Sequence, residues 1–235
     1  MVIGLHKHIQ RLKDSLLSIL GPDGKPRDQY AHCERKLWKM LSPTMRVAAD
    51  SAMQHNPECA HWMVCLHLSM ADDHKGRLRT TIYVQPLALS MDRSVAVAIL
   101  GPPRAEMPAR SIPAAKGSQW ASDRMVHERH LPEGTTEGIL CNSSNALLEG
   151  LITNVFVVRE VEGQFLLQTA HPSQGILDGV CRRLIIQACG EAGVKCLEDA
   201  PLWEQRHAWV QAFTCNSVAG VRMISSMRQL HKHMA

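Results

Sequence analysis

The stretch that most constrains this chain covers residues 147–158, which read Leu-Leu-Glu-Gly-Leu-Ile-Thr-Asn-Val-Phe-Val-Val. Its second half is rich in β-branched and aromatic residues, a composition typical of a buried strand. Glu149 lies at the edge of that strand, and a buried carboxylate without a partner is costly. A structural Arg or a polar backbone group is the commonest partner for such an acid, so a chemical role for Glu149 needs support from the rest of the chain.

Length and composition favour an ordinary globular protein. The chain has 235 residues, enough for one large domain or two small ones, and 45% of them are hydrophobic. The formal net charge of +4 is mild and the basic residues form no long run, so nucleic-acid binding is weakly supported. No apolar run approaches membrane-spanning length, and residues 1–8 lack the apolar core of a signal peptide. We therefore expect a soluble cytoplasmic protein whose partners include neither a membrane nor a nucleic acid.

The eight cysteines are scattered, with no C-x-x-C pair, which favours reduced and mostly buried thiols over a disulfide framework. Cys59, His61, Cys65 and His67 lie close together in the sequence and raise the question of a zinc site. A structural zinc site normally takes ligands from a second cluster with ligand spacing, and the sequence has none. We therefore predict that the chain holds no metal.

Hydrophobic periodicity divides the N-terminal half into helices followed by strands. Helices are expected over about residues 5–20, 30–40 and 43–54, with Ser42 as the N-cap of the third. The segments 62–70, 78–89 and 95–100 then predict an antiparallel three-stranded meander, which gives an α+β unit. The proline-rich segment 106–113 is the best linker candidate. We predict an N-terminal domain over residues 1–105 and a C-terminal domain over residues 114–235.

The C-terminal half alternates strands and helices. Strands are expected at 137–141 and 147–149, which form a hairpin, and at 152–158, 165–169 and 194–197, with a final strand and loop at 212–218. A short helix is expected at 203–209. Between the strands, the glycine-bearing loop 175–181 leads into a helix. Because the first N–H groups of a helix lack backbone partners, such an entry suits a phosphate.

Five segments of the chain together resemble one enzyme family. They are His8-x-x-Arg11-Leu12-x-x-Ser15, Lys116-Gly-Ser-Gln-Trp120, Glu149-Gly-Leu-Ile-Thr-Asn154-Val-Phe156, Gly175-Ile-Leu-Asp-Gly-Val-Cys-Arg182 and Thr214-Cys-Asn-Ser-Val218. In this order they resemble the class IV pyridoxal-phosphate-dependent enzymes, which include branched-chain and D-amino acid aminotransferases and 4-amino-4-deoxychorismate lyase. The resemblance is closest to the plant aminotransferase-like members. It implies an α+β, two-domain fold, with a smaller α/β N-terminal domain and a larger C-terminal pseudo-barrel that binds pyridoxal 5'-phosphate (PLP).

The resemblance also implies a role for each motif residue. Lys116 would form the Schiff base with PLP and move the proton at the substrate Cα. Glu149 would pair with the pyridine nitrogen, which is the specific partner that this buried acid needs. The phosphate would be held by Arg11, by the backbone N–H groups of Val180 and Cys181, and by the hydroxyl of Thr214. Thr153 and Asn154 would line the pocket or serve only in strand packing.

The same resemblance leaves the reaction open. Transamination of an amino acid is the leading expectation, with 4-amino-4-deoxychorismate lyase-type elimination as the runner-up and a non-catalytic protein as the third alternative. The third arises because family members usually have strands before the Arg11 helix and a further segment after residue 224, so we expect the first strands to be missing. Asp178 and Cys181 also stand where the family commonly has Pro and Thr. A homodimer is the expected assembly.

Overall fold

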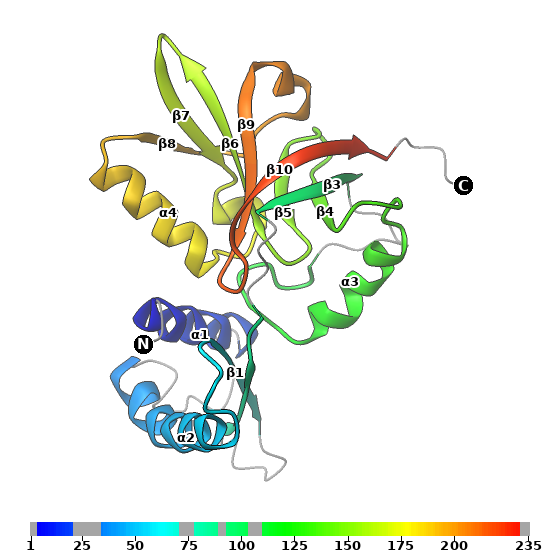
Figure 1. The fold of residues 1–235 in the computed structure, drawn as a ribbon. Helices are drawn as coiled ribbons and strands as arrows, with labels where there is room; N and C mark the ends of the chain where they lie inside the picture. The colour runs from blue at the N-terminus through cyan, green and yellow to red at the C-terminus, as the bar shows by residue number, and fades with distance from the viewer. Residues whose placement is uncertain (1–3, 21–33, 71–77, 89–92, 103–109, 231–235) are drawn as a thin grey trace. The chain divides into compact units, whose positions relative to one another are not determined.

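The computed structural model describes residues 4–20, 34–70, 78–88, 93–102 and 110–230, and the chain divides into two compact units, Met1–Ser90 and Met91–Ala235 (Figure 1). The division lies before strand β3 (Ser94–Gly101), which the sequence had placed in the N-terminal domain. β3 belongs to the larger unit because it pairs with two strands of that unit. The predicted linker 106–113 therefore falls inside the larger unit, and its residues 106–109 lie outside the described residues.

The smaller unit contains the helices α1 (Leu5–Leu20) and α2 (Glu34–His55). α1 has the predicted bounds. The prediction of two helices around Pro43 is wrong, because α2 continues through this residue. An interior proline removes one helical hydrogen bond and disfavours the helix. Leu37 and Leu41 are fully buried before it and Met45 packs on the same cluster after it, so tertiary packing holds the helix together across Pro43.

Strands β1 (Trp62–Met70) and β2 (Leu78–Pro86) form an antiparallel hairpin in the smaller unit. The predicted three-stranded meander is wrong in its third member. β3 pairs in parallel with β4 and β10 of the larger unit instead. The segment 78–86 alternates in burial as a half-buried strand does, whereas β3 is almost continuously buried, which is typical of a strand covered on both faces.

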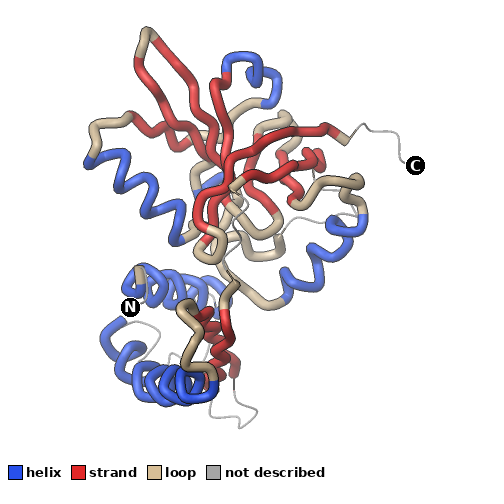
Figure 2. The backbone as a smooth tube through the Cα atoms, in the orientation of Figure 1, coloured by secondary structure: helices blue, strands red, loops and turns tan. Residues whose placement is uncertain are grey.

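The described part of the larger unit contains eight strands in one sheet, flanked by helices (Figure 2). Besides β3 the strands are β4 (Glu137–Cys141), β5 (Leu147–Gly150), β6 (Asn154–Val161), β7 (Gln164–Thr169), β8 (Lys195–Glu198), β9 (Trp209–Asn216) and β10 (Gly220–Gln229). Their order is β5-β4-β3-β10-β9-β6-β7-β8, and β5 also pairs with β6. This additional pairing closes β5, β4, β3, β10, β9 and β6 into a barrel, which confirms the predicted pseudo-barrel.

The barrel interior is filled by aliphatic side chains that include Val97, Ile139, Val155 and Val157, all almost fully buried. The helical elements are α3 (Gln119–Arg129), the 3-10 helix η1 (Pro172–Gln174), α4 (Val180–Glu191) and the 3-10 helix η2 (Trp203–Ala208). α4 packs outside the barrel on Phe156 of β6 and on neighbouring side chains of β9. The sequence missed α3 and β10, so the strand predicted to be final is followed by another.

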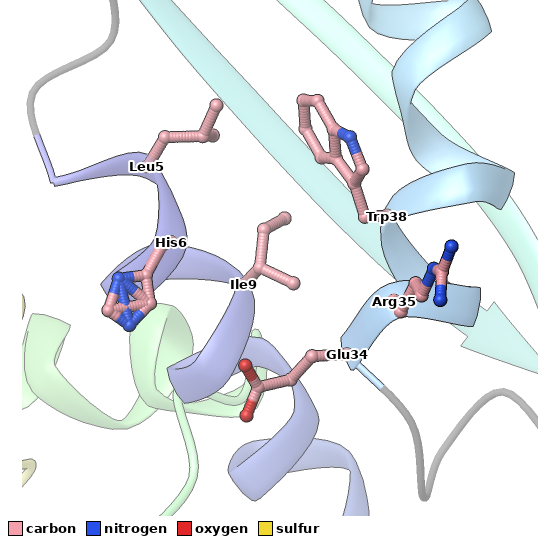
Figure 3. Close-up of a pocket in the computed structure, with 6 residues that line it drawn as sticks. All are labelled: Leu5, His6, Ile9, Glu34, Arg35 and Trp38. Carbon is pink, nitrogen blue, oxygen red and sulfur yellow. The ribbon is translucent and has the colours of Figure 1, made fainter.

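A cavity of about 360 Å³ lies within the smaller unit (Figure 3). It is lined by Leu5, His6 and Ile9 of α1 and by Glu34, Arg35 and Trp38 of α2. Near it, the Lys13 Nζ atom pairs with the Glu34 carboxylate at 3.0 Å and so links the two helices. The cavity contains none of the predicted site residues. Along the described residues, no helix is long and apolar enough to cross a membrane.

Candidate active site

Glu149 is the last residue but one of strand β5 and is deeply buried, with only 3% of its surface exposed. The Nε atom of Arg110 donates to its Oε1 at 3.2 Å, and the backbone N–H of Leu177 donates to its Oε2 at 3.0 Å. Burial raises the pKa of Glu149, while the charges of Arg110 and Lys116 and the Leu177 hydrogen bond lower it. The acid therefore has the structural partners that its burial requires, and it also interacts with the predicted catalytic lysine.

Arg110 is a site residue that sequence reasoning missed. It is 8% exposed and lies in the proline-rich segment, where no pattern marks it. Its guanidinium carbon lies 4.5 Å from the centre of the Trp120 ring, within the range of a cation–π interaction. The Trp120 Nε1 atom donates to the carbonyl of Leu151 at 2.7 Å, two residues beyond Glu149. Trp120 thereby supports both Glu149 and the arginine that pairs with it.

The strand register places three side chains in one row. Glu149 of β5 is paired with Asn154 of β6, and Asn154 is paired with Cys215 of β9. Directly paired residues share a face of a sheet, and the face alternates along each strand. Thr214 is paired with Val155, so its side chain lies on the opposite face, toward the barrel interior. The structure does not bring the Thr214 hydroxyl together with Glu149.

Helix α4 begins immediately beside this row. Asn154 donates from Nδ2 to the carbonyl of Leu177 at 2.8 Å, and so holds the loop that enters the helix. Gly179 is the N-cap, and among the described residues no side chain caps the first turn. The backbone N–H groups of Val180 and Cys181 therefore lie at the positive end of the helix dipole, as an anion site requires.

Lys116 follows the buried Ala115 and is itself exposed. Its charge acts on Glu149, so the structure brings these two predicted residues together. Arg11 lies on α1 in the smaller unit, and its role at a phosphate stays a prediction. Among the described residues, no group of three or more His, Cys, Asp or Glu side chains is arranged to hold a metal ion.

Comparison with protein families gives one match that spans most of the chain. The family described as amino-transferase class IV matches residues 1–227. The chain belongs to the class IV aminotransferase family. No curated protein matches it significantly.

Solved structures share the fold at low identity. A fold IV transaminase from Curtobacterium pusillum is 19% identical with a TM-score of 0.74, over 97% of this chain and 76% of the other. A putative 4-amino-4-deoxychorismate lyase from Legionella pneumophila is 16% identical with a TM-score of 0.71, over 96% and 78%. A hypothetical aminotransferase from Mycobacterium tuberculosis in its PLP-bound form is 18% identical with a TM-score of 0.68, over 94% and 74%. These matches confirm the predicted α+β fold.

In this member of the class IV aminotransferase family, a second buried acid supports the turn after Glu149. Glu137 of β4 accepts hydrogen bonds from the backbone N–H of Gly138 at 3.2 Å, from that of Leu151 at 2.9 Å and from the Thr153 hydroxyl at 3.1 Å. Thr153 is thus engaged with Glu137, and its place in the lining of the pocket stays a prediction. Burial raises the pKa of Glu137 to about 7, although these hydrogen bonds lower it.

The raised pKa of Glu137 predicts a pH-dependent stability. Between its ordinary pKa of 4.5 and about 7, the unfolded chain releases this proton while the folded chain keeps it. The contribution of Glu137 to the free energy of unfolding is therefore fully present below pH 4.5. It falls by about 3 kcal/mol as the pH rises to about 7. Glu137→Gln keeps the shape and mimics the protonated acid. Urea unfolding should show this variant gaining stability relative to the parent between pH 4.5 and 8, and a constant difference would contradict the assignment.

The entry to α4 has no room for a side chain at position 179. A Cβ atom on Gly179 would overlap Oδ1 of Asn154, so Gly179→Ala must disturb the hydrogen bond between Asn154 and Leu177. We expect a loss of about 1–3 kcal/mol in the free energy of unfolding. Gly190→Ala in the same helix meets nothing within 4 Å and should stabilise the protein by about 0.5–1 kcal/mol. If Gly179→Ala and Gly190→Ala change the thermal unfolding temperature equally, the steric argument is contradicted.

Proposed function

We propose that this class IV aminotransferase binds PLP and catalyses the transamination of an amino acid, with Lys116 as the catalytic residue. The observation that carries the proposal is the grouping of a lysine, a buried carboxylate and an uncapped helix start. Lys116 acts electrostatically on Glu149, and Glu149 accepts from Leu177 two residues before the N-cap Gly179. An amine, a carboxylate and free amides are the groups that an aldehyde, a pyridine nitrogen and a phosphate require.

The buried contacts of Glu149 are compatible with such a ligand. Each carboxylate oxygen has two lone pairs, and Arg110 and Leu177 use one on each oxygen. Glu149 can therefore accept another hydrogen bond from a protonated ring nitrogen. Burial raises the pKa of Glu149, and the positive charges of Arg110 and Lys116 oppose this rise and so favour the ionised carboxylate that the contact requires. The residues present thus fit the cofactor of the family.

Bound PLP would supply an electron sink for the pair of electrons left on the substrate Cα after proton removal. The protein residues would handle the proton and the charges. A neutral Lys116 Nζ would accept the proton from the substrate Cα and hold it for transfer to the cofactor. Glu149 would hold the positive charge of the ring nitrogen, and Arg110 would keep this carboxylate in place at 3.2 Å.

The phosphate would be bound by the start of α4. The backbone N–H groups of Val180 and Cys181 would donate to it, and the helix dipole would favour its charge. Arg11 is proposed to add a charge-assisted contact. Thr214 is not proposed in this role, because its side chain lies on the other face of β9. The closeness to plant aminotransferase-like members and the homodimer also remain proposals, and light scattering that shows a monomer would contradict the dimer.

The cofactor assignment can be tested on the full chain. The protein purified with PLP should absorb visible light, and borohydride reduction should leave PLP attached to the peptide that contains Lys116. The matched control is Lys195→Ala, which removes an exposed lysine from β8 of the same unit. A label on any other residue, or no label, would overturn the assignment of Lys116.

The reaction type needs a separate experiment. Half-reactions with a panel of amino acids should shift the visible absorbance as the amino group passes to the cofactor. If no amino donor shifts the absorbance of a protein that carries PLP on Lys116, transamination is contradicted. Pyruvate release from aminodeoxychorismate in that case would establish the lyase reaction instead, and no reaction at all would establish a non-catalytic protein.

A further inference from the structure

A tight turn from Gly150 to Thr153 joins the two strands that carry Glu149 and Asn154, and these two residues are directly paired. The backbone N–H of Gly150 donates to the carbonyl of Thr153 at 2.8 Å and closes the turn. A Cβ atom on Gly150 would overlap the Thr153 hydroxyl and lie 3.1 Å from the carboxyl carbon of Glu137. The turn is therefore packed directly on the Glu137 carboxylate, with no room for a side chain at Gly150.

Glu137 is the side chain that holds this turn against β4. Its Oε2 atom accepts from the Thr153 hydroxyl at 3.1 Å, and its Oε1 atom accepts from the backbone N–H of Leu151 at 2.9 Å. The Leu151 N–H also donates to the carbonyl of Gly138 at 2.9 Å. The Thr153 hydroxyl is therefore the donor that loses its acceptor when Glu137 is removed. Because Glu137 is only 4% exposed, solvent does not offer an equal acceptor in its place.

Beyond the turn, Glu149 and Asn154 bind the same residue from two sides. The backbone N–H of Leu177 donates to Oε2 of Glu149 at 3.0 Å, and the carbonyl of Leu177 accepts from Nδ2 of Asn154 at 2.8 Å. Leu177 lies two residues before Gly179, the N-cap of α4. A shift of one paired residue relative to the other is therefore transmitted to the loop that enters α4. The turn thus sets the spacing between the Glu149 carboxylate and the first N–H groups of the helix.

We propose that Glu137 is a positioning residue for PLP, which fixes the distance between Glu149 and the start of α4 through the turn that it holds. This inference rests on the proposed function, in which Glu149 meets the ring nitrogen and α4 binds the phosphate. A rigid ligand that contacts both groups binds best when the protein already holds them at the matching separation, because little reorganisation is then needed. Glu137 acts on the ligand only through the turn, since both of its oxygens accept from protein donors.

Hydrogen exchange of the full chain without cofactor tests whether Glu137 holds the loop. The control variant is Ile224→Ala, which removes buried apolar atoms of β10 and lowers global stability away from the turn. The two variants are compared at urea concentrations that give equal protection of the Val157 amide, which lies in the barrel and reports global opening. The Leu177 amide should then be about tenfold less protected in Glu137→Ala than in Ile224→Ala. Equal protection of Leu177 would overturn the proposal.

The affinity for PLP, measured by fluorescence titration, tests the effect on the ligand. Glu137→Ala should weaken binding by about tenfold. Glu137→Gln keeps an acceptor for Leu151 and a polar contact with Thr153, so it should bind almost as the parent does. Thr153→Val should also weaken binding, whereas Thr153→Ser keeps the hydroxyl and should not. Ile224→Ala should keep the parent affinity at temperatures where it is folded, and an equal loss in Ile224→Ala and Glu137→Ala would overturn the proposal.

A double variant shows whether Glu137 acts through the turn. If it does, Thr153→Val should add nothing to the loss caused by Glu137→Ala, because the acceptor of the hydroxyl is already absent. Losses that add would mean that Thr153 meets PLP by itself, and would overturn the proposal. A protein in which Glu137→Ala lowers the protection of Leu177, but which never binds PLP, would contradict the proposed function, while the hold of Glu137 on the entry to α4 would stand.

Discussion

Lys116→Ala is expected to reduce transamination by about 10³-fold or more. In the proposed mechanism, Lys116 is both the amine that bonds to the cofactor and the group that moves the Cα proton, and each contribution to catalysis is large. Lys116 is exposed, so its removal should cost little stability. The change should therefore appear in the turnover number, measured with an amino donor and a keto acid, while the thermal unfolding temperature stays close to that of the parent.

The control for this prediction is Lys195→Ala, which should retain full turnover. A second experiment supplies the missing amine to the Lys116→Ala variant from solution. If Lys116 supplies a base, a small primary amine in the buffer should recover part of the activity of Lys116→Ala and none of that of Glu149→Ala. Activity of Lys116→Ala that is comparable to the parent, without added amine, would contradict the catalytic role of Lys116.

Glu149→Ala is expected to destabilise the protein by about 3–5 kcal/mol. The substitution leaves Arg110 as a buried charge without its carboxylate, and breaking a buried ion pair by removing one partner is strongly destabilising. It also leaves the backbone N–H of Leu177 without its acceptor. Urea unfolding at pH 7 measures the loss. Glu160→Ala, which removes an exposed carboxylate from neighbouring β6, should change stability by less than about 0.5 kcal/mol.

A double variant separates the charge effect from the loss of packing. Arg110→Leu combined with Glu149→Leu replaces the buried ion pair with apolar side chains, and such replacements are often neutral in stability. The double variant should therefore be more stable than Glu149→Ala, yet inactive. Glu149→Gln keeps the shape of the side chain and should lower turnover by about 10²-fold, because it removes the charge that is proposed to face the ring nitrogen. A double variant as unstable as the single one would contradict the ion-pair argument.

Features that depend on local sequence patterns could be predicted from the sequence. The stretch 147–158 contains strand β5 and most of β6, and Glu149 is buried at their junction as expected. The helix over 5–20 and the glycine-bearing entry to α4 also have the predicted form. These features depend on side-chain periodicity and on the conformational preferences of neighbouring residues, which the sequence contains directly.

The tertiary structure alone decided which distant residues meet. Arg110 pairs with Glu149 across 39 positions of the sequence, and nothing local marks it. The motif that contains Thr214 also contains Cys215, but only the pairing with β6 shows which of the two faces the helix. One step along a strand reverses the face of every side chain, so a correct motif can still assign the wrong neighbour. The sequence by itself therefore determined the family, the strand and its buried acid, while the partners of that acid were set by the packing of segments that are distant in the sequence.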